Sequence, residues 1–196
     1  MDARPILLAL GLTALSSSCG GIPAYASSVF EADDEGWLLG NNGDDTVPIL
    51  HPEGGNPGGN ICGIDHSLGN LWYFVAPPKF QGNASGAWGK RLTFDLKQYS
   101  IYNQIRGRDV ILNGGGLSVV NNMRFAPGLD WTPYSFTLDD TSGWTIDDQA
   151  GGHGPAATEA ELRQVLKSLT SLRIRGEFVD GDLDQACLDN VYFGRD

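Results

Sequence analysis

The chain has 196 residues, of which 41% are hydrophobic, 19% are charged and 27 are glycines, and its formal net charge is −11. This composition excludes a disordered or low-complexity chain and indicates a globular protein with many turns. A strongly acidic surface repels phosphate backbones and anionic lipids, so we expect no nucleic-acid partner.

The first 26 residues are typical of a signal peptide. Arg4 precedes an apolar run at residues 5–15, and the small-x-small pattern at residues 24–26 marks a cleavage site. The run is too short to cross a bilayer. We therefore expect a secreted, extracellular protein whose single domain covers residues 27–196. Cys19 leaves an alternative open, a lipid-anchored envelope protein that meets a membrane only through this cysteine.

Short β-type runs alternate with Gly, Asn, Asp and Pro along the rest of the chain. In residues 91–99, alternate positions are apolar (Leu92, Phe94 and Leu96), which is the period of a half-buried strand. Many short strands between turn clusters predict an all-β fold, a sandwich or jelly roll. The expected strands are residues 28–32, 36–40, 60–65, 71–76, 91–99, 109–114, 117–122, 131–138, 143–146, 172–179 and 187–193.

The aromatic run at residues 71–76 cannot place all its rings in one core, because neighbouring side chains on a strand point to opposite faces. We expect Trp72, Phe74 and Ala76 on the core face and Tyr73 outward. Two prolines follow and end the strand, since neither can donate to the sheet.

One short amphipathic helix is predicted after residue 157. Thr158 and Glu161 form a capping box. The apolar stripe that follows consists of Leu162, Val165, Leu166 and Leu169. We expect this helix to pack across the end of the sandwich.

Two cysteines remain after the leader, Cys62 and Cys187. An even count in an exported chain predicts a disulfide, and only one pairing is possible. Two unrelated buried thiols are the alternative.

Several motifs together resemble the laminin B domain, also called laminin IV. They are "WYFVAPPKFQGNASGAWGKRLTFDLKQ", "DVILNGGGLSVV", "ATEAELRQVLKSLTSLRIRGEF" and "LDNVYF", and their order follows the family from Phe30 to Phe193. The segment "HPEGGNPGGNICGID" is similar to a Gly-rich region of stand-alone bacterial members. The resemblance implies a galactose-binding-like β-sandwich, similar to carbohydrate-binding modules, with an extracellular, non-catalytic role. Cys187 departs from the family pattern, which often has glycine before "LDNV".

A structural calcium ion is implied by the same resemblance, at the place where the first and last strands of such sandwiches meet. Glu31 and Asp189 occupy the corresponding strands, and Gly55 and Asn56 are expected to add carbonyl oxygens, which are hard ligands that Ca²⁺ prefers. The alternative is that Glu31 and Asp189 face solvent independently.

Exposed aromatics can stack on sugar faces while neighbouring polar groups bind hydroxyls. The candidate ligand-binding residues are Tyr73, Trp88, Tyr102 and Asn103. The alternative for each aromatic is that it seals an edge of the sandwich. Asn83 begins an Asn-x-Ser sequence, which is an acceptor for glycosylation only in a eukaryotic secretory route.

No catalytic motif is present: the sequence lacks H-E-x-x-H, G-x-S-x-G and G-x-x-x-x-G-K. Asp180, Asp182 and Asp184 alternate as in a calcium-binding EF-hand loop, but Gln185 stands where that loop requires glycine. We therefore interpret this segment as a solvated acidic turn.

Together these features predict a secreted, non-catalytic binding or adhesion module for a glycan or another extracellular polymer. Two alternatives remain open. One is a structural matrix or envelope protein without a small-ligand site, and the other is a glycan-active enzyme without a familiar motif.

Overall fold

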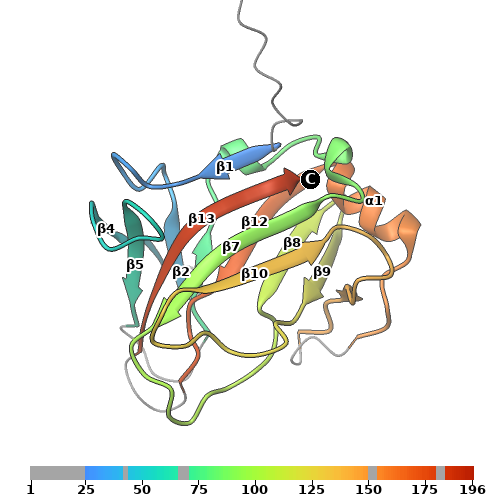
Figure 1. Cartoon of the computed structure of the whole chain (residues 1–196). Helices are drawn as coiled ribbons and strands as arrows, with labels where there is room; N and C mark the ends of the chain where they lie inside the picture. Colours follow the sequence, from blue (N-terminus) through green and yellow to red (C-terminus); the bar gives the residue numbers. More distant parts are fainter. Residues whose placement is uncertain (1–24, 42–43, 66–70, 150–153, 180–183) are drawn as a thin grey trace, which may run out of the picture.

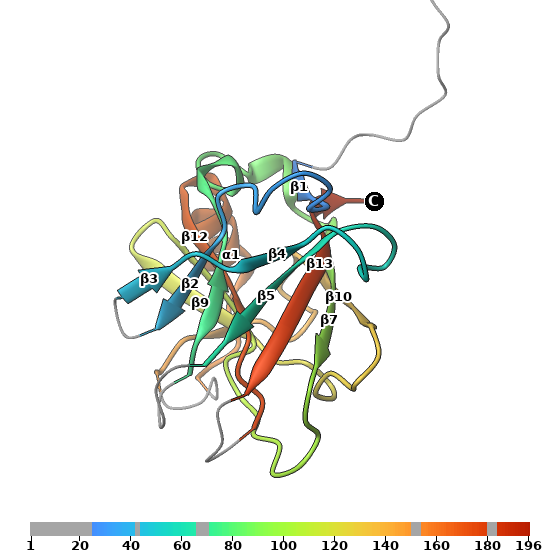
Figure 2. The same cartoon turned by 90° about the vertical axis from the view of Figure 1, so that its left-hand side faces the viewer.

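The computed structural model describes residues 25–41, 44–65, 71–149, 154–179 and 184–196. Two antiparallel sheets stack face to face, and one short helix lies at one end of the stack (Figures 1 and 2). The predicted all-β jelly-roll sandwich with one short helix is confirmed. Among the described residues, no helix is long and apolar enough to cross a membrane.

The six-stranded sheet faces the viewer in Figure 1. Its strand order is β10-β7-β13-β5-β4. β5 pairs with the N-terminal part of β13, and β1 pairs with residues 191–193 of the same strand. The strands are β1 (Ala26–Ser28), β4 (Ile49–His51), β5 (Asn60–Ile64), β7 (Arg91–Gln98), β10 (Thr132–Thr137) and β13 (Gln185–Arg195).

The seven-stranded sheet forms the second layer, with the order β11-β9-β8-β12-β6-β2-β3. Its strands are β2 (Leu38–Asn41), β3 (Asp44–Thr46), β6 (Tyr73–Val75), β8 (Val110–Gly114), β9 (Leu117–Asn121), β11 (Thr145–Ile146) and β12 (Leu169–Arg175). Two short 3-10 turns, η1 (Pro78–Phe80) and η2 (Ser85–Ala87), connect β6 to β7.

The predicted strands agree with the observed ones except near the N-terminal end and at 172–179, where β12 instead runs from Leu169 to Arg175. The run at 28–32 shares only Ser28 with β1, because Phe30 has a positive φ of 52° that ends extended pairing. Strands β3 and β4 were not predicted. The predicted domain boundary after Ala26 falls inside β1, where Ala26 lies opposite Phe193; the leader itself lies outside the described residues, apart from Tyr25 and Ala26.

The core between the sheets includes Trp72, Phe74 and Ala76, as predicted. Trp72 approaches the backbone so closely at Gly63 and Gly176 that a Cβ atom at either glycine would collide with the indole ring. The indole Nε1 of Trp72 donates to a buried carboxylate, so this large side chain is both packed and hydrogen-bonded.

Helix α1 (Glu159–Lys167) begins with the predicted capping box. The Glu161 amide donates to the Thr158 hydroxyl (3.3 Å), and the Thr158 amide donates to the Glu161 carboxylate (2.8 Å). The buried face of the helix consists of Leu162, Val165 and Leu166. The helix packs against β8 and β9, and Leu169, the last residue of the predicted stripe, instead begins β12.

Candidate functional site

The outer face of the six-stranded sheet carries outward side chains that line up across three strands. Ser135 on β10 lies opposite Thr93 on β7, and Thr93 lies opposite Tyr192 on β13. At the start of β7, two residues before Thr93, Arg91 lies opposite Arg195 of β13. Thr93, Ser135, Tyr192 and Arg91 point away from the core because side chains on a strand alternate between faces. Arg195 shares this face because the register of β13 shifts between Phe193 and Arg195, at Gly194, which has a positive φ of 76°.

A groove follows these rows. Its cavity volume is about 540 Å³, which lies within the usual range of small-ligand sites, about 300–1,000 Å³. The polar and aromatic side chains that line it include Arg91, Asp95, Ser135, Asn190, Tyr192 and Arg195. We call this the β13 groove.

A hydrogen-bond network fixes the floor of the β13 groove. One oxygen of Asp95, Oδ2, accepts bonds from Asn190 Nδ2 (2.9 Å) and Asn56 Nδ2 (3.1 Å). Asn190 has a positive φ of 53° at a bulge in β13, which lets its side chain reach Asp95. The amides are therefore held in place before any ligand arrives.

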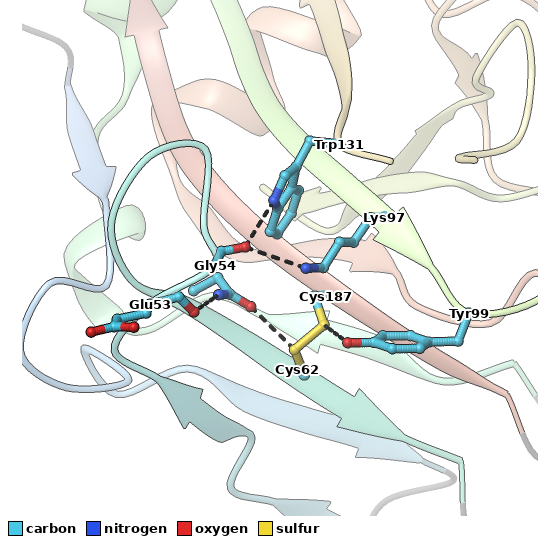
Figure 3. Close-up of a disulfide and its surroundings, with 8 residues drawn as sticks. Glu53, Gly54, Cys62, Lys97, Tyr99, Trp131 and Cys187 are labelled. Atoms are coloured by element: carbon cyan, nitrogen blue, oxygen red, sulfur yellow. Dashed lines mark hydrogen bonds between the residues drawn. A yellow bond between two sulfur atoms is a disulfide. The ribbon is translucent and has the colours of Figure 1, made fainter. Parts of the chain in front are cut away.

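Beyond the groove on the same sheet, Trp131 and Lys97 converge on the glycine-rich loop after β4 (Figure 3). The indole Nε1 of Trp131 (3.0 Å) and Nζ of Lys97 (3.3 Å) both donate to the carbonyl of Gly54, and Nζ lies 4.6 Å from the centre of the indole ring. The loop is thereby tied to the edge of the groove.

The predicted disulfide between Cys62 and Cys187 is confirmed (Figure 3). The two residues lie directly opposite each other on β5 and β13, and the hydroxyl of Tyr99 is 3.9 Å from the sulfur of Cys187. The bond joins the strand that follows the glycine-rich loop to the strand that lines the groove.

Asp189 and the glycine-rich loop, which were predicted to bind calcium, do lie together. The buried Asp189 carboxylate accepts bonds from the backbone amides of Asn56 and Asn190, both at 2.6 Å. Burial, together with the nearby carboxylates of Asp95 and Glu31, raises the pKa of Asp189 to about 6. This concentration of negative charge favours a cation in principle.

The donor set fits calcium only in part. Both oxygens of Asp189 already accept N–H bonds, and the Glu31 carboxylate lies against Gly58 of the loop. Within the part of the chain that the structure describes, no group of three or more His, Cys, Asp or Glu side chains is arranged to hold a metal ion. Calcium at Glu31, Gly55, Asn56 and Asp189 therefore stays a prediction.

Tyr73 points away from the core, as predicted, but the expectation that it is exposed is wrong. The side chain is only 5% exposed because it packs on the outer face of the seven-stranded sheet with Ile111, Val120 and Leu71. Burial raises the pKa of the Tyr73 phenol. In this position its ring offers no platform to a sugar.

The other three predicted ligand residues lie outside the β13 groove. Trp88 packs against the core, and the guanidinium of Arg163 lies over its ring at 3.9 Å, so that ring is covered. Tyr102, 78% exposed, and Asn103 lie in the loop between β7 and β8. The structure therefore does not bring the four residues into one site.

The interpretation of residues 180–184 as a solvated turn is wrong for Asp184; residues 180–183 lie outside the described residues. Asp184 is buried and accepts bonds from Trp72 Nε1 (3.1 Å) and from the amides of Phe178 (2.7 Å) and Val179 (3.2 Å). Its carboxylate organises the end of the sandwich.

The residues of the β13 groove were missed as ligand candidates. Thr93 and Asp95 occupy polar positions of an alternating strand, and Ser135 does the same on β10. This signal identifies an outward face, but it does not indicate that β10, β7 and β13 are neighbours.

Comparison with known proteins identifies the family. The profile described as Laminin B (Domain IV) matches residues 73–194. Laminin subunit gamma-1 of Danio rerio is 29% identical over 184 residues, covering 90% of this chain and 11% of the relative. Human laminin subunit gamma-2 is 33% identical over 126 residues, covering 61% of this chain and 10% of the relative.

A solved structure shows the same fold. The L4b domain of human laminin alpha-2 superposes with a TM-score of 0.68 at 13% sequence identity, covering 86% of this chain and 96% of that domain. The chain spans only about a tenth of the length of the laminin subunits that it matches. By its sequence and its fold, the chain belongs to the laminin B (domain IV) family.

Proposed function

We propose that this protein is a secreted, non-catalytic module that binds a glycan of an extracellular or cell-surface polymer in the β13 groove. The observation that carries the proposal is the groove itself, in which one aromatic ring and several fixed hydrogen-bonding groups share an open face. Tyr192 offers a ring, and Asn190, Ser135 and Asp95 offer groups that pair with hydroxyls.

Preorganisation supports the proposal. The Asp95–Asn190–Asn56 network already holds the groove floor, so ligand binding orders few further side chains. The groove also crosses three strands of one sheet, which is a rigid support. A polymer can lie along an open groove of this kind without being cut.

A purely structural role is the second candidate. Membership of the laminin B family favours it, because the relatives are laminin subunits. In that case the outer face of the six-stranded sheet contacts no glycan. A glycan-active enzyme is the third candidate and predicts cleavage products from any glycan that binds.

Binding of the mature domain to an array of extracellular polysaccharides tests the proposal. Tyr192→Ala should lower affinity for every bound glycan by about tenfold or more, the effect of losing about 1.4 kcal/mol. Tyr102→Ala is the matched control, because Tyr102 is an exposed aromatic outside the groove. Equal affinities of wild type and Tyr192→Ala would place the site elsewhere, and no binding to any glycan would leave the structural role.

A further inference from the structure

Two arginines face each other at one end of the β13 groove. Arg91 on β7 and Arg195 on β13 are directly opposite, both are exposed, and both line the groove. Like charges opposite each other on neighbouring strands are destabilising. The pair therefore has an energetic cost in the free protein.

The two arginines have no close carboxylate partner among the described residues. Neither Arg91 nor Arg195 forms an ion pair with a described residue, and the only ring contact of Arg195 is with Tyr192, at 4.4 Å from the ring centre. Nearby Asp196 is paired instead with Lys90, at 3.6 Å. The Asp95 carboxylate, at the groove floor, is engaged by two amides.

The groove is thus cationic at one end in a chain whose net charge is −11. A guanidinium presents a planar fork of donors that matches the oxygens of a carboxylate or a sulfate, and it stays charged at all accessible pH values. The overall negative field opposes a dense polyanion but not a single acidic group placed between two arginines.

We propose that the β13 groove selects an acidic glycan, one that carries carboxylate or sulfate groups, and holds one such group between Arg91 and Arg195. In the free protein the guanidinium of Arg195 lies over the Tyr192 ring, 4.4 Å from the ring centre. On binding, Arg195 turns toward the acidic group, and the neighbouring sugar lies on the ring face that the guanidinium leaves. This inference rests on the proposed glycan-binding function and adds the chemical class of the ligand.

The test compares acidic and neutral probes of matched length by calorimetry at low salt. Each acidic probe carries a single acidic group. The carboxylate probe is a methyl-esterified oligogalacturonate with one free carboxylate, and its neutral partner is the fully esterified oligosaccharide. The sulfate probe is a carrageenan disaccharide with one sulfate, and its neutral partner is the same disaccharide after desulfation. At least one acidic probe should bind tenfold or more tightly than its neutral partner, and added NaCl should reduce the difference. The probe pair that shows this preference identifies the acidic group as a carboxylate or a sulfate.

The double variant Arg91→Gln/Arg195→Gln should lose this preference and keep the affinity for the neutral partner. Arg124→Gln is the control, an exposed arginine outside the groove. The double variant should melt at or slightly above the wild-type temperature, because the substitution removes a repulsion.

Four outcomes separate the inference from the function on which it rests. Equal binding of acidic and neutral probes, or an acidic preference that survives in the double variant, overturns the inference and leaves glycan binding intact. Absence of binding to all four probes and to the wider array overturns both. Arginine-dependent binding of poly-glutamate, with no glycan bound, would assign the groove to an acidic peptide and also overturns both.

Discussion

Glu177 should make the stability of this protein depend on pH near neutrality. It lies just after β12, is 5% exposed, and accepts the backbone N–H of Trp72 at 3.2 Å. Burial, together with the nearby carboxylates of Asp65 and Asp184, raises the pKa of Glu177 from 4.5 to about 7. In the unfolded chain the side chain is solvated and regains its ordinary pKa.

The direction of this pH dependence follows from proton binding. Between pH 4.5 and 7 the folded protein holds a proton on Glu177 that the unfolded chain has lost. The contribution to the free energy of unfolding is therefore fully present below pH 4.5 and is lost as the pH rises through 7. Each pKa unit corresponds to about 1.4 kcal/mol, so the contribution is on the order of 3 kcal/mol at most.

The variant Glu177→Gln isolates this effect, because its amide oxygen can still accept the Trp72 N–H and carries no charge. At pH 8.5 it should be more stable than wild type by about 1–3 kcal/mol, which is about 3–10 °C in melting temperature for a domain of this size. At pH 4.5 the two proteins should melt together.

Melting curves from pH 4.5 to 8.5, followed by circular dichroism, measure the difference. A buried acid that does not act on Glu177, such as Asp109, whose pKa burial also raises, contributes equally in both proteins and cancels. Glu53→Gln, at an exposed position, should follow wild type throughout. The reasoning would be refuted if Glu177→Gln were less stable than wild type at pH 8.5. It would also be refuted if the difference in melting temperature between the two proteins were the same at pH 4.5 and at pH 8.5.

Two further predictions concern the disulfide and the predicted calcium ion. The Cys62–Cys187 bond spans 125 residues of sequence, and its reduction should lower the free energy of unfolding by about 2–5 kcal/mol. Urea denaturation with and without reductant measures this difference. An unchanged denaturation midpoint after verified reduction would contradict the prediction. Calcium at a hundredfold excess over its dissociation constant should stabilise the mature domain by about 2.7 kcal/mol, and Asp189→Asn should abolish the gain. Identical melting of wild type in calcium and in chelator, after removal of bound metal, would eliminate the site.

Much of the fold was predictable because its signals are local. Alternation in β7, the capping box of α1 and the glycine-bounded strands each depend on a few neighbouring residues. Strands β3 and β4 escaped prediction because β3 is polar throughout and β4 is confined between Pro48 and Pro52, so neither has the apolar run that identified the equally short β6. The pairing of Cys62 with Cys187 was predictable only because the leader was expected to be removed, which left two cysteines.

The site was less predictable because it depends on which strands are neighbours. Tyr73 satisfies the rule for an outward residue, yet Ile111 and Val120 of distant strands cover it. Conversely, nothing local places Arg91 opposite Arg195; the sheet order and the bulge in β13 do so. The periodicity of residues along a strand identifies which side chains point outward, whereas the order of strands in the sheet decides which outward side chains are neighbours.

The central claim is that the outer face of the six-stranded sheet binds a glycan, and a crystal structure of the mature domain with a bound oligosaccharide tests it most directly. We expect the sugar in the β13 groove, with one ring against Tyr192 and hydroxyls paired with Asn190. A sugar bound only elsewhere, for example against Tyr102 or on the seven-stranded sheet, would contradict the claim.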